Sequence, residues 1–322
     1  MKITKLYYFI TLLVTSIFSM LILFGCSAPM NSLENISTVK TGKGTINALA
    51  FSPSGTQFAV ASSEGLWIYD TRGNTGPVVL TKESKFRALA WSDHGLASGS
   101  DSTITLWSTE TKEPQRTFNK GTEALMFTGN TWIFCVSYKY KHIDGWDVRT
   151  GSRLPDYPQS IPWPGSGIKQ NGDHSIIVEA PEAFVYREKE KQGYERITQR
   201  EVPSAAAFGP NGIWARALKD VVSDNQKRTV EYNRGVTVTH KGKTYNIAEK
   251  METPATVMAF STDGNFLATG GQTDAEIHLW NVKTRKLLQI LTTQTDGVTA
   301  LAFSIDGVLA CGGRKGKICL WK

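Results

Sequence analysis

The stretch "LASGSDSTITLWS", residues 96–108, contains the pattern on which most of the chain is built. Two short runs of small and apolar residues flank "SDST", a polar turn that includes Asp101. The second run ends at Trp107 and is rich in β-branched and aromatic residues, a composition that favours a strand. The stretch therefore predicts two antiparallel strands joined by a tight turn.

A second recurring phrase precedes such hairpins, an apolar strand that ends in an aromatic residue and a polar turn with glycine. It reads "ALAFSPSG" at 48–55, "ALAWSDHG" at 88–95, "ALMFTGN" at 124–130, "AAAFGPNG" at 205–212, "MAFSTDG" at 258–264 and "ALAFSIDG" at 300–307. The residue that closes the following strands recurs about every 40 residues, at Tyr69, Trp107, Trp146, Tyr186, Trp280 and Trp321. The interval from Tyr186 to Trp280 is just over two periods, which predicts a further unit.

That further unit begins at Phe208, and "RGVTVTHKG" at 234–242 supplies its third strand. Its extra length lies in residues 218–233, which are polar and charged and predict an extended hairpin. A weaker unit occupies residues 166–187, where the order of strands and turns persists without the aromatic residue before the first turn. The count of units comes to seven.

Units of about 40 residues with four short strands resemble WD repeats, which build β-propellers of radially arranged blades. The family's dipeptide is present at Trp146 and Asp147. The resemblance implies an all-β fold, a seven-bladed WD-type β-propeller over residues 34–322. The family's buried network of Asp, His, Ser or Thr, and Trp is mostly absent from the sequence, so we expect packing to hold the blades.

The C-terminal phrase "KICLWK", residues 317–322, ends the last unit after three strands, whereas a short segment precedes the first unit. We predict that residues 34–40 pair with this last strand and close the ring, as WD-repeat propellers generally do. An apolar sheet edge left open would invite aggregation. The predicted closure residues are Ile36, Val39, Ile318, Leu320 and Trp321.

The N-terminal segment has the layout of an export signal, with Lys2 and Lys5 ahead of uncharged residues 6–25. Its end, "LFGC" at 23–26, resembles the bacterial lipobox, which implies cleavage before Cys26 and acylation of that cysteine. The alternative is an uncleaved membrane helix, since about 19 apolar residues span a bilayer. Both interpretations place the rest of the chain outside the cytoplasm, at the bacterial cell envelope. The expected parts are a signal peptide at 1–25, a lipid-anchored linker at 26–33 and the propeller at 34–322.

Three further cysteines, Cys135, Cys311 and Cys319, do not form the pattern of a disulfide scaffold. Cys311 and Cys319 flank one predicted turn and can face each other across a hairpin, so either a bridge or two buried thiols fits the sequence. The charge balance is mildly basic, with 36 Lys and Arg against 29 Asp and Glu. Because acidic residues lie among the basic ones, and because the leader predicts export, nucleic-acid binding is not expected.

No catalytic motif emerges from the sequence. Its five histidines fall in different units without metal-ligand spacing, and neither a nucleophile elbow nor a phosphate-binding glycine loop is present. We therefore expect no metal, no cofactor and no enzyme activity. A propeller enzyme whose site is built from several blades remains an alternative.

The WD-repeat resemblance implies a scaffold for a protein or peptide partner. One loop, "PDYPQSIPWPGSG" at 155–167, is stiffened by its prolines, so ordering it on a partner costs less entropy. The alternative is a loop whose tryptophan packs on its own blade. The candidate binding residues are Pro155, Tyr157, Pro158, Pro162, Trp163 and Pro164. We expect a monomeric, lipid-anchored scaffold, with an envelope-assembly lipoprotein as the alternative.

Overall fold

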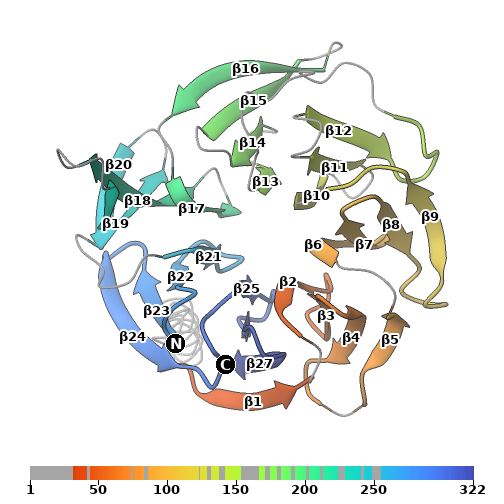
Figure 1. Ribbon diagram of the computed structural model, residues 1–322, viewed down its shortest axis with the longest axis horizontal. Helices are drawn as coiled ribbons and strands as arrows, with labels where there is room; N and C mark the ends of the chain where they lie inside the picture. Colours follow the sequence, from red (N-terminus) through yellow and green to blue (C-terminus); the bar gives the residue numbers. More distant parts are fainter. Residues whose placement is uncertain are drawn as a thin grey trace, which may run out of the picture. The chain divides into compact units, whose positions relative to one another are not determined.

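The regular elements of the described residues are all β-strands (Figure 1). The computed structural model describes residues 32–41, 44–73, 75–82, 86–122, 124–128, 132–137, 142–153, 167–170, 175–179, 183–189, 193–200, 203–210, 213–223, 229–240, 243–248 and 255–322. The predicted leader and Cys26 lie outside these ranges. The expectation of an all-β chain is confirmed for the part that the structure describes.

Within these ranges the strands form seven antiparallel sheets, six of four strands and one of three. The first three sheets contain β2 (Ile46–Phe51), β3 (Gln57–Ser62), β4 (Gly65–Asp70) and β5 (Val78–Thr81); β6 (Phe86–Ser92), β7 (Gly95–Ser100), β8 (Ile104–Trp107) and β9 (Pro114–Phe118); and β10 (Ala124–Thr128), β11 (Trp132–Ser137) and β12 (His142–Asp147). The next three contain β13 (Gly167–Gln170), β14 (Ser175–Glu179), β15 (Ala183–Lys189) and β16 (Gly193–Arg200); β17 (Pro203–Phe208), β18 (Trp214–Ser223), β19 (Thr229–His240) and β20 (Lys243–Ala248); and β21 (Val257–Phe260), β22 (Phe266–Gly270), β23 (Glu276–Asn281) and β24 (Lys286–Thr292). The last contains β25 (Ala300–Phe303), β26 (Leu309–Gly312), β27 (Lys317–Trp321) and β1 (Asn35–Lys40).

The turn after each recurring aromatic phrase explains why the strands stop where they do. Gly264 and Gly307 adopt φ angles of 74° and 86°, a region that glycine enters without steric cost. In the last of these turns, the Ser304 hydroxyl accepts a 2.8 Å hydrogen bond from the backbone N–H of Val308. In the four phrases that contain both residues, serine directly after the aromatic residue and glycine four positions after it therefore reverse the chain between the first and second strands.

The predicted further unit is present as the sheet of β17 to β20. Its two middle strands are long, and their pairing continues from Lys219 opposite Asn233 to Ser223 opposite Thr229. The extended hairpin predicted for residues 218–233 is thus confirmed. The weaker unit predicted at 166–187 corresponds to β13, β14 and β15, which pair in sequence order.

Strand β1 lies beside β27, at the outer edge of the last sheet (Figure 1). The antiparallel register places Val39 opposite Ile318. Of the two predicted closure residues on β1, Ile36 is 48% exposed. A register shift between Asn35 and Ser37 leaves Ile36 without a residue opposite it, whereas Val39 packs on the cluster that contains Ile318 and Leu320.

Neighbouring sheets contact each other mainly through their first strands. The first strands that contact each other are β2 and β6, β6 and β10, β10 and β13, β17 and β21, β21 and β25, and β25 and β2. The fourth and fifth sheets contact each other through β14 and β17. Glycines in second strands make room for the next sheet: a Cβ added at Gly270 would lie 2.9 Å from Val298 Cβ, and one added at Gly312 would collide with Ile46. The small residues of these strands therefore lie where another sheet comes close.

Two sheets keep a buried tryptophan hydrogen bond that the sequence had suggested was mostly lost. Trp107 Nε1 donates to Ser98 Oγ at 2.8 Å, and Trp280 Nε1 donates to Thr269 Oγ1 at 3.1 Å. Each bond joins the third strand of a sheet to its second strand. Packing is therefore supplemented by a side-chain bond in these two sheets.

Candidate partner-binding sites

The sequence-predicted site residues fall into two groups in the structure. The lipidation residue Cys26 and the loop residues Pro155, Tyr157, Pro158, Pro162, Trp163 and Pro164 lie outside the described residues. The closure residues of β27 are described and buried, with Ile318, Leu320 and Trp321 at most 2% exposed. They hold the fold together and offer no surface to a partner.

A first opening, of about 500 Å³, lies where the first strands of several sheets begin. We call it the arginine opening; it is lined by Thr45, Ile46, Asn47, Arg87, Gln272, Thr299 and Arg314. These residues come from the starts of β2 and β6, from the segment before β25, and from the turns that follow β22 and β26. The opening thus collects side chains from four sheets.

Two guanidinium groups line the arginine opening, and one of them is paired with a carboxylate. Arg87 forms a fork with Asp101, in which Nε lies 2.5 Å from one carboxylate oxygen and Nη2 lies 3.3 Å from the other. Arg314 donates to the side-chain oxygen of Gln272 at 3.3 Å, and it forms no ion pair with any described residue. Arg314 therefore keeps most of its five donors available for a ligand.

The walls of the arginine opening are fixed by hydrogen bonds between sheets. Asn47 Nδ2 donates to the carbonyl oxygen of Phe86 at 2.6 Å, which ties β2 to β6. The Thr299 hydroxyl lies 2.6 Å from the carbonyl oxygen of Ile46, which ties the last sheet to the first. Because hydrogen bonds already hold these side chains in place, little of their conformational entropy is lost when a partner binds.

This arrangement suits the recognition of a peptide. Guanidinium groups bind carboxylates and carbonyl oxygens, and the amides of Asn47 and Gln272 provide both donors and acceptors. Sequence reasoning missed the site because its residues come from four separate units. The only available signal was the position of each arginine within its repeat unit. Arg87 stands directly before "ALAW", and Arg314 lies in the turn "GRKG" of another unit.

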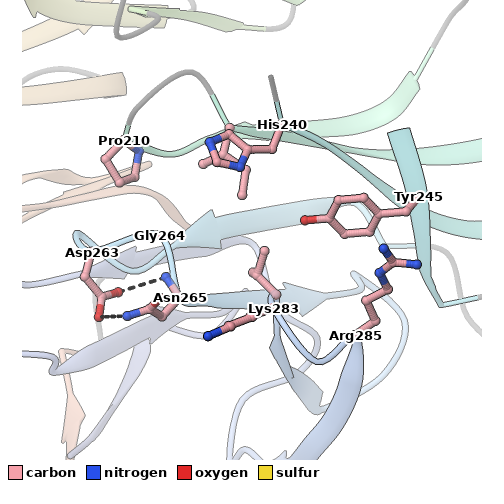
Figure 2. A pocket seen from close by; sticks show the side chains of 10 residues that line it. Pro210, His240, Tyr245, Asp263, Gly264, Asn265, Lys283 and Arg285 are labelled. Atoms are coloured by element: carbon pink, nitrogen blue, oxygen red, sulfur yellow. Dashed lines mark hydrogen bonds between the residues drawn. The ribbon is translucent and has the colours of Figure 1, made fainter. Parts of the chain in front are cut away.

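A second opening, of about 360 Å³, lies at the opposite ends of the strands, between the sheet of β17 to β20 and the sheet of β21 to β24 (Figure 2). We call it the turn pocket; it is lined by Pro210, Ile213, His240, Tyr245, Asp263, Gly264, Asn265, Val282, Lys283 and Arg285. Figure 2 shows the Tyr245 hydroxyl pointing into the pocket and the Arg285 guanidinium beside the Tyr245 ring. The guanidinium carbon lies 4.3 Å from the ring centroid, a cation–π contact.

The single carboxylate of the turn pocket is bound within its own turn. Asp263 accepts hydrogen bonds from the Ser261 hydroxyl at 2.5 Å, from the Asn265 backbone N–H at 3.0 Å and from Asn265 Nδ2 at 2.7 Å. Partial burial raises the pKa of Asp263, but these hydrogen bonds outweigh it, so the net effect is a lowered pKa. The carboxylate is therefore ionised at neutral pH and already supplied with donors.

Among the residues that the structure describes, no group of three or more His, Cys, Asp or Glu side chains is arranged to hold a metal ion. Nor do those ranges contain a helix with the length and apolar character needed to span a bilayer. The polar side chains that line the two openings are arginine, lysine, histidine, aspartate, amide, hydroxyl and phenol groups. Such groups bind ligands through hydrogen bonds and charge.

Comparison with known proteins identifies repeats at both ends of the propeller region. The description "WD domain, G-beta repeat" matches residues 34–70, 251–281 and 285–322. A 66-residue segment is 38% identical to the U3 snoRNP-associated protein-like EMB2271 of Arabidopsis thaliana. The matching segment covers 20% of this chain and 13% of the Arabidopsis protein. The chain therefore contains WD repeats in three places, within an all-β architecture of the β-propeller type.

Proposed function

We propose that this protein is a non-catalytic scaffold that binds a protein partner through the arginine opening. The observation that carries the proposal is the convergence of Arg87 and Arg314, from two different sheets, on one opening with fixed walls. WD-repeat proteins usually bind protein partners, and a partner that presents a carboxylate or a turn of carbonyl oxygens suits these donors. The protein acts as a monomer in this proposal.

The proposal includes a closed ring of seven blades, with β1 as its closing strand. Two observations support it. The β25–β2 contact joins the last sheet to the first, and the WD match at 34–70 spans β1 together with β2, β3 and β4. One repeat of sequence thus contributes its first strand to the last sheet and three strands to the first sheet, which links the two sheets covalently.

We further propose that the protein is attached to the bacterial envelope through Cys26, facing away from the cytoplasm. The support is the sequence "LFGC" at 23–26 after an uncharged stretch. Two or three acyl chains hold a protein stably on a membrane, whereas one chain binds only reversibly. Metabolic labelling with an alkyne fatty acid tests this proposal: wild-type protein is expected to carry the label and Cys26→Ser to lack it.

Affinity capture from crosslinked, solubilised membranes tests the scaffold proposal. The double variant Arg87→Ala and Arg314→Ala is expected to lose the partners that wild-type protein captures. Arg72→Ala is the matched control, because Arg72 is exposed in the turn after β4, away from the arginine opening. Replacement of residues 155–167 by a short Gly-Ser link, as a third arm, tests the predicted proline-rich loop. Equal capture by wild-type protein and the double variant would remove the arginine opening from the proposal.

The Arabidopsis relative suggests a second candidate, in which the partner belongs to a ribonucleoprotein. The shared segment covers only 13% of that protein, so the similarity is stronger support for a shared repeat than for a shared binding partner. Ribonuclease treatment before capture distinguishes the two candidates. A partner lost on ribonuclease treatment supports the ribonucleoprotein, and a partner retained supports direct protein binding.

A further inference from the structure

The turn pocket combines several hydrogen-bond donors that have no bonding partner among the described residues. The Lys283 ammonium, the Tyr245 hydroxyl and the His240 ring all line it, and none of them forms a side-chain hydrogen bond or ion pair with a described residue. Arg285 contacts the face of the Tyr245 ring but pairs with no carboxylate in those ranges. Lys283 and Arg285 are exposed and Tyr245 and His240 are half-buried, so a ligand that enters the pocket can reach all four groups.

The charges of the turn pocket favour an anion. Lys283 and Arg285 contribute two positive charges, and Asp263 contributes one negative charge that is already bound by Ser261 and Asn265. The pocket therefore keeps a net positive charge. Burial raises the pKa of Tyr245, while Arg285 acts in the opposite direction; the net effect is a raised pKa. Tyr245 is accordingly a neutral O–H donor at physiological pH.

The backbone holds Arg285 at this place at some cost. Its φ angle is 60°, in the left-handed region that Gly73 and Gly151 occupy in the corresponding turns after β4 and β12. Lys112, after β8, has a similar φ of 66°, so a side chain is tolerated in this turn. At Arg285 the turn aims the guanidinium at the Tyr245 ring of the neighbouring sheet (Figure 2). The contact fixes one cation at the border of the two sheets.

The remaining wall of the turn pocket is apolar. Pro210 and Ile213 come from the turn between β17 and β18, and Val282 follows β23. A ligand with an anionic group and a small apolar body can thus place its charge near Lys283 and Arg285 and its body against this wall. The volume of about 360 Å³ is within the range of small-molecule sites.

We propose that the turn pocket is a second binding site, specific for a small oxyanion-bearing ligand whose phosphate or carboxylate group is bound by Lys283, Arg285, Tyr245 and His240. The site goes beyond the scaffold function, because it lies at the opposite strand ends from the arginine opening. Its four donor groups outnumber the two oxygens of a carboxylate and are sufficient for the three terminal oxygens of a phosphate monoester. Both groups share the chemistry of charge-assisted hydrogen bonds.

Isothermal titration of the full chain, purified in detergent micelles, tests the proposal with phenyl phosphate and benzoate as anionic probes and benzyl alcohol as the neutral probe. We expect at least one anionic probe to bind and benzyl alcohol to bind at least about tenfold more weakly. Preference for phenyl phosphate identifies a phosphate site and preference for benzoate a carboxylate site. Equal binding of benzyl alcohol, or no binding of either anion at millimolar concentration, overturns the proposal.

Variants locate the binding within the turn pocket. Lys283→Ala and Arg285→Ala are each expected to lower the affinity for the preferred anionic probe by about tenfold or more. Arg72→Ala is expected to leave this affinity unchanged. Circular dichroism and thermal melting verify that each variant is folded. Folded Lys283→Ala and Arg285→Ala proteins with wild-type affinity place the anion elsewhere and refute the site. These two variants are expected to capture the same partners as wild-type protein, so that loss of anion binding can be distinguished from loss of the scaffold function.

Discussion

Thr38 lies opposite Cys319 in the pairing of β1 with β27, although 281 positions separate the two residues in the sequence. The Thr38 hydroxyl lies 3.9 Å from Cys319 Sγ, within reach of a weak hydrogen bond to sulfur. Cys319 itself is completely buried. Strand β1 therefore covers this thiol, and release of β1 is the direct way to expose it.

Val39→Asp is expected to destabilise the protein by about 1–3 kcal/mol, because it places a half-buried charge against the cluster of Ile318 and Leu320. Ile36→Asp on the same strand is the matched control, since Ile36 is 48% exposed; its effect is expected within about 0.5 kcal/mol. Urea denaturation measures both changes. Similar losses in the two variants would contradict the role of Val39 in holding β1.

Release of β1 has a second readout in the reactivity of Cys319. A hydrogen bond from Cys311 lowers the pKa of Cys319 to about 6, against the opposing effect of burial. Thiol modification then depends on access more than on deprotonation. Val39→Asp is expected to speed the labelling of Cys319 by iodoacetamide, whereas Ile36→Asp is not, and peptide mass spectrometry identifies the labelled residue.

The sequence was sufficient for the strands and turns because their signals are local. The aromatic phrase recurs in six units and is followed in four of them by serine and by glycine at fixed offsets. Even the unusual hairpin of β18 and β19 could be predicted. The two openings could not, since Arg87 and Arg314, or Tyr245 and Arg285, come together only through contacts between sheets. Which of Ile36 and Val39 packs on β27 could not be predicted for a similar reason: the register shift in β1 follows from its pairing with β27 and has no signal in the apolar pattern.

Asp144 is expected to be the most sensitive carboxylate of the third sheet. Its side chain is fully buried, lies 3.4 Å from Lys120 Nζ and forms an ion pair with Arg153. Its two partners are partly exposed, with 32% of the Lys120 side chain and 64% of the Arg153 side chain accessible, so their charges stay solvated in the variant. The expected loss is about 1.5–3 kcal/mol, that of hydrogen bonds to a charged group. Denaturation of Asp144→Ala measures the loss. Asp101→Ala is the control, since the exposed pair with Arg87 is worth at most about 1 kcal/mol.

Ser98→Ala tests the tryptophan hydrogen bond in the second sheet. The substitution leaves the buried Trp107 N–H without its acceptor, which costs about 1–3 kcal/mol. The exposed Ser102, in the turn that joins β7 to β8, provides the control variant Ser102→Ala, with an expected change within about 0.5 kcal/mol. A loss below that level in Ser98→Ala would mean that packing alone positions Trp107.

Asp263 makes stability depend on pH in the acidic range. Its pKa is lower in the folded protein than the ordinary value of about 3.9, so the unfolded chain binds the proton more readily. The stabilising contribution is present above about pH 5 and is lost as the pH falls through the folded pKa. The difference in unfolding free energy between wild-type protein and Asp263→Asn is thus expected to be constant from pH 5 to 7 and to shrink below about pH 4. A constant difference down to pH 2.5 would show that the hydrogen bonds of Ser261 and Asn265 do not favour the carboxylate.

A count of reactive thiols tests whether Cys311 and Cys319 are free thiols or a disulfide, and whether Cys26 is acylated. Cys135, Cys311 and Cys319 are buried free thiols in the structure, and burial raises the pKa of Cys135 to about 12. Ellman's reagent is therefore expected to find no rapidly reacting thiol among these three in the folded protein. In guanidinium chloride without a reductant all three are expected to react, because unfolding exposes them. Fewer than three would indicate a bridge between Cys311 and Cys319, whose Cα atoms are paired across β26 and β27. A fourth reactive thiol must be Cys26, the remaining cysteine of the sequence, and its presence would contradict the proposed acylation.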